Sequence, residues 1–383
     1  MKNPIFLTLA ASALLLGLAA CQTTEILDQR QDGKINLRTS VNTATKAVGL
    51  STDRLKSQGF HLAVFEGKVG DANVVKYFEM DMDSDQFKED GYYTPYFWGD
   101  RTLHFYAWYP KSDDAGVMDV DADNGYAITY VPAENAAQQK DFSVAYNTGT
   151  KEENASSGVN MNFRHALSQV EIIVNNGSTV ADNNVIIKAV KVGNAIKSGT
   201  FHMPLYPTDS AVSEENRLTS LWTDNVRTNS GDKNIQSYSI FHESPITIIK
   251  GQQQSVMGAG GNWMVVPQVN SAEQFWNPEE GGAGDKMYMA LLVKLMQGAA
   301  TVYPSANTPA EDKVGDYAWT AVPIPAGSVL EAGKKYTFTL TFIINSGNAG
   351  NRISDGKEIL SHPIKLVVTT DDWIEVSNGE TLY

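Results

Sequence analysis

The clearest pattern in the chain is an alternation of side chains over residues 35–45. Branched or apolar residues occupy one side of this segment, and mostly polar residues occupy the other. The first set is Ile35, Leu37, Thr39, Val41, Thr43 and Thr45, and the second is Asn36, Arg38, Ser40, Asn42 and Ala44. A period of two with many β-branched residues is typical of a half-buried strand. The pattern therefore predicts a strand ahead of the first compact region.

Short apolar or alternating runs, separated by turn residues, continue through the rest of the chain. We expect strands over 60–65, 103–109, 126–131, 163–174, 185–192, 239–249, 263–267, 287–295, 318–324, 335–343 and 364–368. Residues 147–160 are rich in Gly, Ser, Asn and Glu, which predicts a linker or a long hairpin loop. No long run with a 3.6-residue period competes with these strands, so the sequence predicts an all-β protein built from β-sandwiches.

The beginning of the chain has the pattern of an export signal. Lys2 precedes an uncharged apolar run over 5–20, which ends in small residues next to Cys21. A run of this length with a positive start is typical of a secretory signal peptide rather than a membrane span. Residues 18–21 (LAAC) also resemble a bacterial lipoprotein box, which implies that Cys21 is acylated and becomes the mature N-terminus. We therefore expect residues 1–20 to be removed and lipid to anchor the protein.

Composition narrows the classes of function further. A length of 383 residues fits about two domains. The formal net charge is -14 and no run of five basic residues occurs, which disfavours a nucleic-acid partner. Cys21 is the only cysteine, so its acylation would leave no thiol for a disulfide, a zinc site or a nucleophile.

Motifs for catalysis or metal binding are weak or incomplete. The six histidines form no HExxH or HxH pair, and they are His61, His104, His165, His202, His242 and His362. Two acidic alternations offer calcium oxygen ligands without the closing glutamate of an EF-hand, and they are Asp81, Asp83 and Asp85, then Asp119, Asp121 and Asp123. Solvated acidic turns are the favoured explanation of both. No phosphate loop or nucleophile elbow is present. We expect neither catalysis nor a cofactor.

Several stretches share an order and spacing that point to one family. They are the lipobox at Cys21, the step over 45–47 (TKA), and residues 103–110 (LHFYAWYP), 163–170 (FRHALSQV), 266–268 (VPQ), 333–340 (GKKYTFTL) and Trp373. Together they resemble the fimbrillin family, the pilin-like lipoproteins of Bacteroidetes. The resemblance implies two transthyretin-like β-sandwich domains in tandem, on a protein that is lipid-anchored and exposed at the cell outer membrane. It also implies assembly with other pilin subunits into an adhesive fimbria, with a possible surface receptor as a further partner.

The same resemblance implies how subunits assemble. A protease removes the N-terminal strand, and a neighbouring subunit donates a strand to the opened groove by β-strand addition. In this chain the displaced strand would present Ile35, Leu37, Thr39 and Val41. Lys46 is the first candidate for the cut, because the whole alternating strand precedes it. Arg38 and Arg54 are alternatives, because many members of the family carry arginine where Lys46 stands.

These expectations give a plan of the chain. It divides into a signal peptide (1–20), a tether with the removable strand (21–46), an N-terminal sandwich (47–157) and a C-terminal sandwich (158–383). The tail 373–383 is a candidate donor strand, although its alternation breaks after Val376.

Three alternatives stay open. Residues 22–46 could be only a spacer. The protein could be a monomeric glycan-binding lipoprotein, in which Trp98, Trp222 or Trp276 stacks on sugar rings. A β-sandwich hydrolase with a distant pair of carboxylates is the third.

Overall fold

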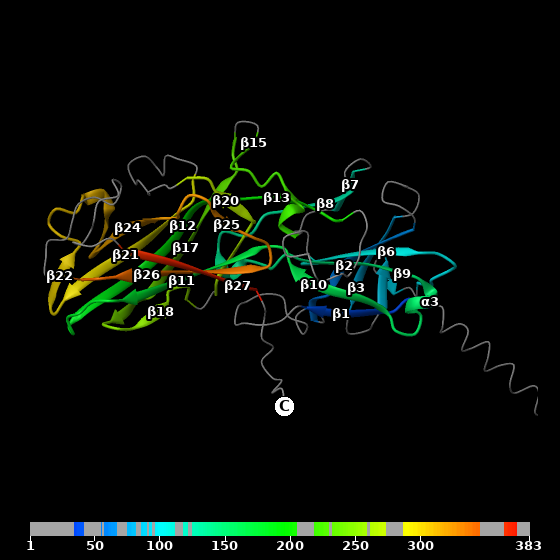
Figure 1. Cartoon of the computed structure of the whole chain (residues 1–383), viewed down its shortest axis with the longest axis horizontal. Helices are drawn as coiled ribbons and strands as arrows, with labels where there is room; N and C mark the ends of the chain where they lie inside the picture. Colours follow the sequence, from blue (N-terminus) through cyan, green and yellow to red (C-terminus); the bar gives the residue numbers. More distant parts are fainter. Residues whose placement is uncertain are drawn as a thin grey trace, which may run out of the picture.

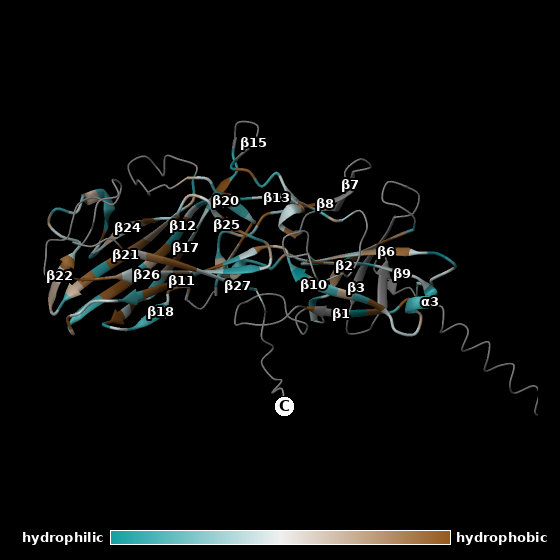
Figure 2. Cartoon of the chain, in the orientation of Figure 1, coloured by the Kyte–Doolittle hydropathy of each residue, from teal (hydrophilic) through white to brown (hydrophobic). Residues whose placement is uncertain are grey.

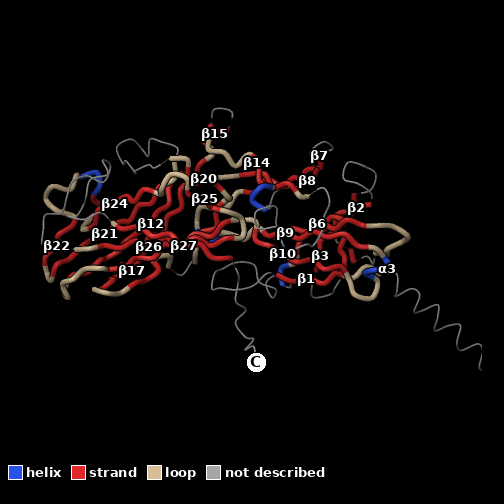
Figure 3. Tube along the Cα trace, viewed as in Figure 1, coloured by secondary structure: helices blue, strands red, loops and turns tan. Residues whose placement is uncertain are grey.

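The structure is a computed structural model. It describes residues 34–41, 55, 57–66, 75–81, 86–89, 92–93, 96–111, 118–121, 125–204, 218–229, 232–258, 261–272, 286–344 and 364–373. Strands make up nearly all the regular structure of these residues, which confirms the all-β class (Figure 3). Helical turns include η2 (Ala136–Gln138), α3 (Lys151–Asn154) and η3 (Ala310–Asp312), and residues 55, 57–58 and 218–220 are also helical. Within the described ranges, no helix is long and apolar enough to cross a membrane.

An eight-stranded sheet occupies one end of an elongated molecule (Figure 1). Its strands, in spatial order, are β1 (Leu37–Val41), β10 (Val159–His165), β9 (Ser143–Gly149), β6 (Leu103–Tyr109), β2 (Phe60–Glu66), β3 (Val75–Asp81), β4 (Gln86–Glu89) and β5 (Tyr92–Tyr93). Every pair in this sheet is antiparallel except β1 with β10, which is parallel. The chain therefore returns to the edge strand β1 only after building the rest of the sheet.

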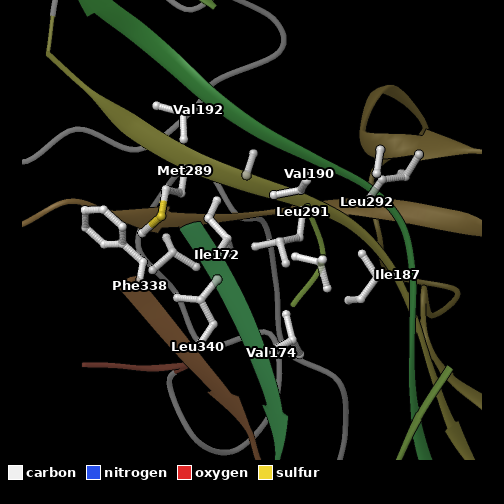
Figure 4. Close-up of a cluster of buried hydrophobic side chains, with 14 of the residues drawn as sticks. Ile172, Val174, Ile187, Val190, Val192, Met289, Leu291, Leu292, Phe338 and Leu340 are labelled. Atoms are coloured by element: carbon white, nitrogen blue, oxygen red, sulfur yellow. The ribbon is translucent and has the colours of Figure 1, made fainter. Parts of the chain in front are cut away.

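Two further sheets pack face to face at the other end. The five-stranded sheet has the order β18 (Gln253–Ser255), β11 (Ser168–Asn176), β26 (Lys334–Phe342) and β27 (Lys365–Asp372), with β19 (Trp263–Val265) also on β11. The six-stranded sheet has the order β17 (Ile235–Ile249), β12 (Asn183–Ile196), β21 (Tyr288–Gln297), β24 (Tyr317–Pro323) and β23 (Lys313–Val314), with β22 (Ala300–Tyr303) on β21. Their inner faces bury alternate side chains of β11, β26, β12 and β21, such as Ile172 and Met289 (Figure 4). This is the packing of a β-sandwich.

Smaller sheets join the two ends. A four-stranded sheet has the order β14 (Trp222–Thr223), β13 (Gly199–His202), β8 (Gly125–Tyr130) and β7 (Met118–Asp121). Two further sheets have two strands each: β15 (Thr228–Asn229) with β16 (Asp232–Lys233), and β20 (Gln268–Asn270) with β25 (Ser328–Leu330). A central core lies between this four-stranded sheet and one face of the eight-stranded sheet, where Phe142 contacts Phe201 and Trp222. Apolar residues follow the strands at both ends of the molecule, whereas the turn at α3 is hydrophilic (Figure 2).

Most predicted strands are confirmed, and some extend beyond the predicted limits. One prediction was wrong: residues 163–174 form two strands, β10 and β11, in different sheets. The Ala166 amide donates to the Phe142 carbonyl at 2.9 Å, which continues the register of β10 on β9, whereas the Ala166 carbonyl accepts from Trp222 Nε1 at 2.8 Å. The side-chain bond from Trp222 therefore takes the Ala166 carbonyl out of the ladder where β10 ends.

Residues 147–160 span a hairpin connection between β9 and β10, with α3 inside it. Of the two predictions for this segment, the long hairpin loop is confirmed and the linker is not. The predicted boundary at 157/158 stays a prediction, and β10, which follows it, pairs with strands that precede it.

Candidate functional site

The edge of the eight-stranded sheet formed by β1 is the candidate site. Its backbone runs parallel to β10, with Leu37 opposite Val159, Thr39 opposite Met161 and Val41 opposite Phe163. The predicted strand over 35–45 is thus confirmed over residues 37–41, and residues 42–45 lie outside the described residues. Parallel pairing is slightly weaker per residue than antiparallel pairing. The pairing of β1 with β10 is therefore easier to break than the antiparallel pairings in the rest of the sheet.

Side-chain burial follows the predicted alternation. Ile35 and Val41 are 1% and 5% exposed, Leu37 and Thr39 are half-buried, and Arg38 is exposed. Full burial of two aliphatic side chains contributes about 3–6 kcal/mol. Two deep side-chain positions, six residues apart, therefore anchor this short strand.

The surface beneath β1 is strongly apolar. Val159, Met161 and Phe163 of β10 are fully buried there, and the Phe163 ring lies 5.0 Å from that of Phe60 in an edge-to-face contact. Trp98, also fully buried, belongs to the same cluster. Removing β1 would expose this cluster together with the unpaired backbone of β10.

Contacts at the start of β1 fix its register. The Ile35 amide donates to the Tyr96 carbonyl at 2.8 Å, and the Val159 amide donates to the Asn36 carbonyl at 2.9 Å. Gly158 has a φ of +73°, and a Cβ at this position would lie 3.2 Å from the Asn36 carbonyl oxygen. A glycine is needed because the turn into β10 passes close to β1 in a left-handed conformation.

The predicted processing residues lie in two places. Arg38 is within β1, on the face away from the core. Cys21, Lys46 and Arg54 lie outside the described residues. The donor candidate 373–383 does too, apart from Trp373.

Trp373 ends the described part of the chain in a buried polar cluster that sequence reasoning missed. Its ring stacks on His165, with centroids 4.1 Å apart and planes at 7°. His165 Nδ1 lies 2.5 Å from Asp141 Oδ2, which also accepts a hydrogen bond from Ser143 Oγ at 2.9 Å. All four side chains are buried. No sequence signal links these residues, because their spacing matches no motif.

This cluster has the residue types of a serine triad but another arrangement. In a triad the serine hydroxyl bonds histidine Nε2, whereas Ser143 here approaches Nδ1, on the side of Asp141. Within the described structure Nε2 of His165 is buried and has no hydrogen-bond partner. The cluster thus holds the ring of Trp373 against His165 of β10.

The other histidines and aspartates considered from the sequence take part in packing, hydrogen bonds or strands where the structure describes them. His61 stacks on Trp108 at 5.2 Å, and His104 Nδ1 lies 2.8 Å from Thr148 Oγ1. Asp81, Asp119 and Asp121 fall in strands, whereas Asp83, Asp85 and Asp123 lie outside the described residues. In the described ranges, no group of three or more His, Cys, Asp or Glu could hold a metal ion.

Trp98 and Trp222 cannot act as sugar platforms, which removes both residues from the glycan-binding alternative. Their exposed fractions are 0% and 5% because both fill cores, Trp98 against Phe105 and Trp222 against Phe201. Trp276 lies outside the described residues.

Comparison with known proteins identifies the family. A model of fimbrillin-like proteins matches residues 45–356, so the chain belongs to the fimbrillin-like family. No curated protein matches the sequence.

Solved structures similar to this chain come from Bacteroides and Parabacteroides species. A candidate cell adhesion protein from Bacteroides ovatus is 15% identical, with 90% of this chain and 99% of that chain covered and a TM-score of 0.43. One from Parabacteroides distasonis is 9% identical, covering 91% and 100%, with a TM-score of 0.46. A fimbrial assembly protein from Parabacteroides distasonis is 11% identical, covering 88% and 99%, with a TM-score of 0.37.

Sequence stretches that suggested the family gather around the central core. Ala166 and Leu167, Val266, and Trp373 are all members of it, although they lie far apart in the sequence. Gly333 joins them through its backbone, since its amide donates to the Leu167 carbonyl at 2.9 Å and its carbonyl accepts from the Trp373 amide at 2.8 Å. These stretches therefore fix how the sheets meet rather than line an open site.

Proposed function

We propose that this protein is a non-enzymatic subunit of a cell-surface fimbria and that β1 is a temporary occupant of its own assembly groove. Membership of the fimbrillin-like family supports the fimbrial role. The observation that carries the mechanism is the packing of β1, an edge strand in parallel register on β10. Proteolysis after β1 would let it leave, and a strand from a neighbouring subunit would then pair with β10.

The groove specifies what an incoming strand must present. An incoming strand that keeps the register of β1 needs apolar side chains at the positions of Ile35 and Val41, and uncharged ones at those of Leu37 and Thr39. Main-chain bonds to β10 would give affinity, and the alternate side-chain positions would give selectivity.

Strand β27 and the residue before it meet this requirement better than the tail after Trp373. Residues 364–370 (IKLVVTT) repeat the pattern of residues 35–41 (INLRTSV), with Ile, then Leu, then two β-branched residues at alternate positions. Strand β27 is an edge strand paired with β26, and Val367 and Val368 on it are exposed. The tail, aligned from Ile374, would place Glu380 in the buried position of Val41. We therefore infer that β27 is the donor.

Export and anchoring complete the proposal. The leader over 1–20 and Cys21 support a lipid anchor at the outer membrane before assembly. A cut at Lys46 would release the anchored segment with the whole of β1, whereas a cut at Arg38 would leave the end of β1 in the groove.

Crosslinking of assembled subunits tests the mechanism. With residues 364–370 in place of 35–41, Val367 would lie opposite Asn160 of the next subunit. A variant carrying Asn160→Cys and Val367→Cys should therefore give a ladder of crosslinked oligomers with a short thiol crosslinker, but only after trypsin-like proteolysis. Mass spectrometry should find mature subunits that begin at Ala47.

The matched control pairs Asn160→Cys with Val269→Cys, because Val269 is also exposed but lies on β20. A ladder without proteolysis, or polymer that never crosslinks through Val367, would contradict the donor assignment. Protein that keeps residues 21–46 and stays monomeric after proteolysis would contradict strand exchange itself.

A further inference from the structure

The edge strand β17 contains an irregularity that the assembly mechanism does not use. Phe241 pairs with Ala189 and Ile246 pairs with Ile187, so four residues (242–245) bulge opposite Lys188 alone. Lys188 Nζ donates to the carbonyls of His242 at 2.7 Å and Glu243 at 3.1 Å. Bulges at sheet edges commonly redirect side chains at binding sites. This one is held in place by a lysine from the next strand.

The bulge leaves a large aromatic side chain open to solvent. Phe241 is 61% exposed, and its ring meets that of Trp319 edge to face at 6.1 Å and 89°. Trp319 itself is almost buried. The phenyl ring is therefore supported on one side and accessible on another.

A hollow of about 600 Å³ lies beside this ring, between β17 and the turn that contains η2. Phe241, Ile240 and Met257 give it apolar surface. Its polar lining consists of Glu134, Asn135, Ser237, Ser239, His242 and Glu243. No Lys or Arg is among the described residues that line it, and neither carboxylate forms an ion pair with another described residue. The polar groups are thus carboxylates, hydroxyls, an amide and an imidazole.

His242 contributes an imidazole ring to the lining of the hollow. Its Nε2 is buried without a hydrogen-bond partner in the described structure, while the ring bonds the backbone of Val256. Burial lowers the pKa of His242, which keeps the ring uncharged at neutral pH. The ring rests against Gly258, where a Cβ would lie 3.5 Å from its Cε1.

We propose that this hollow binds a carbohydrate, with a sugar ring packed on Phe241 and its hydroxyls bonded to Glu243 and the neighbouring polar side chains. Aromatic faces pack against the C–H side of a sugar, and carboxylates accept bonds from hydroxyls that face the other way. The carboxylates of Glu134 and Glu243 in the lining disfavour phosphate and carboxylate ligands, and the Nζ of the neighbouring Lys188 is engaged by the carbonyls of His242 and Glu243. The volume is in the range of small-molecule sites and accommodates one or two sugar rings.

Saturation-transfer NMR of the whole purified chain tests the site. The probes are lactose, cellobiose, maltose and diacetylchitobiose at millimolar concentration. We expect saturation of at least one disaccharide, with Kd raised about tenfold in Phe241→Ala, because an aromatic contact contributes about 1.4 kcal/mol. Glu243→Gln should weaken binding as well. Both side chains are exposed, so neither change removes core packing.

Val269→Ala is the matched control, because it also removes an exposed apolar side chain from a distant strand. It should bind like the unaltered protein. No saturation of any probe, or equal binding by Phe241→Ala, would overturn the proposal and leave the bulge with Pro245 as protection of the sheet edge. Preferential binding of a lysine amide to the same side chains would also overturn it. Fibre assembly plays no part in this measurement.

Discussion

Replacing Ile35 by alanine tests whether β1 is a separable unit. Ile35 is 1% exposed and belongs to the core cluster under the edge of the eight-stranded sheet. Its amide bond to Tyr96 is made by the main chain and remains possible in the variant. The substitution therefore removes apolar packing and leaves the hydrogen-bonding pattern unchanged.

The size of the effect follows from this burial. Ile→Ala in a core costs about 2–5 kcal/mol, and the lower part of that range suits an edge position that can partly relax. If β1 opens without the rest of the sheet, a loss of about 2–3 kcal/mol in its docking free energy should raise the open population about 30- to 150-fold.

Hydrogen exchange can measure this opening at one amide. The Val159 amide bonds to Asn36 across the β1–β10 junction, so its exchange requires β1 to leave. We expect it to exchange about 30- to 150-fold faster in Ile35→Ala. The Phe105 amide, in the middle of the same sheet, should keep its rate. Arg38→Ala is the control for β1 itself, because Arg38 is exposed.

Equal acceleration at Val159 and Phe105 would refute the reasoning. It would mean that β1 unfolds only with the whole sheet, and a strand that cannot open separately could not be exchanged at an acceptable rate. An unchanged rate at Val159, with Ile35→Ala folded, would show that Ile35 contributes little to docking.

Three other substitutions test the remaining features. Trp373→Ala should lower the free energy of unfolding by about 3–5 kcal/mol, measured by urea denaturation, because it empties a buried position on His165. Burial lowers the pKa of His242, so the unfolded chain binds more protons than the folded chain in acid. Stability should therefore fall as the pH drops below about 6.5, the ordinary histidine pKa. In His242→Gln, the Tm measured against pH should change less over this range. Gly193→Ala should destabilise by about 1–3 kcal/mol or more in thermal melts, because its Cβ would fall within the Tyr288 ring.

Local chemistry made some elements predictable. The limits of β6 agree with the prediction, because an aromatic-rich run ends at Pro110, which has no amide hydrogen to continue a ladder. The alternation over 35–41 likewise revealed β1 and the side it buries. Both signals are contained in a few neighbouring residues.

Contacts between residues far apart in the sequence could not be predicted from the sequence. The partner of β1 lies more than a hundred residues downstream, and nothing in residues 35–45 selects β10 over any other strand. The break at Ala166 involves a bond from Trp222, which meets it only in the folded chain. The hollow beside Phe241 depends on a bulge for which Pro245 is the one local sign. Such features depend on which strands become neighbours.

The parallel pairing of β1 with β10 also sets an order of events during biogenesis. Strand β1 is synthesised before β10, so its docking surface is completed only when β10 arrives, about 120 residues later. Closing so long a loop is slow, so the edge stays uncovered while the intervening strands assemble. A substitution that delays β10 should therefore cause aggregation in transit, even if the finished subunit would be stable.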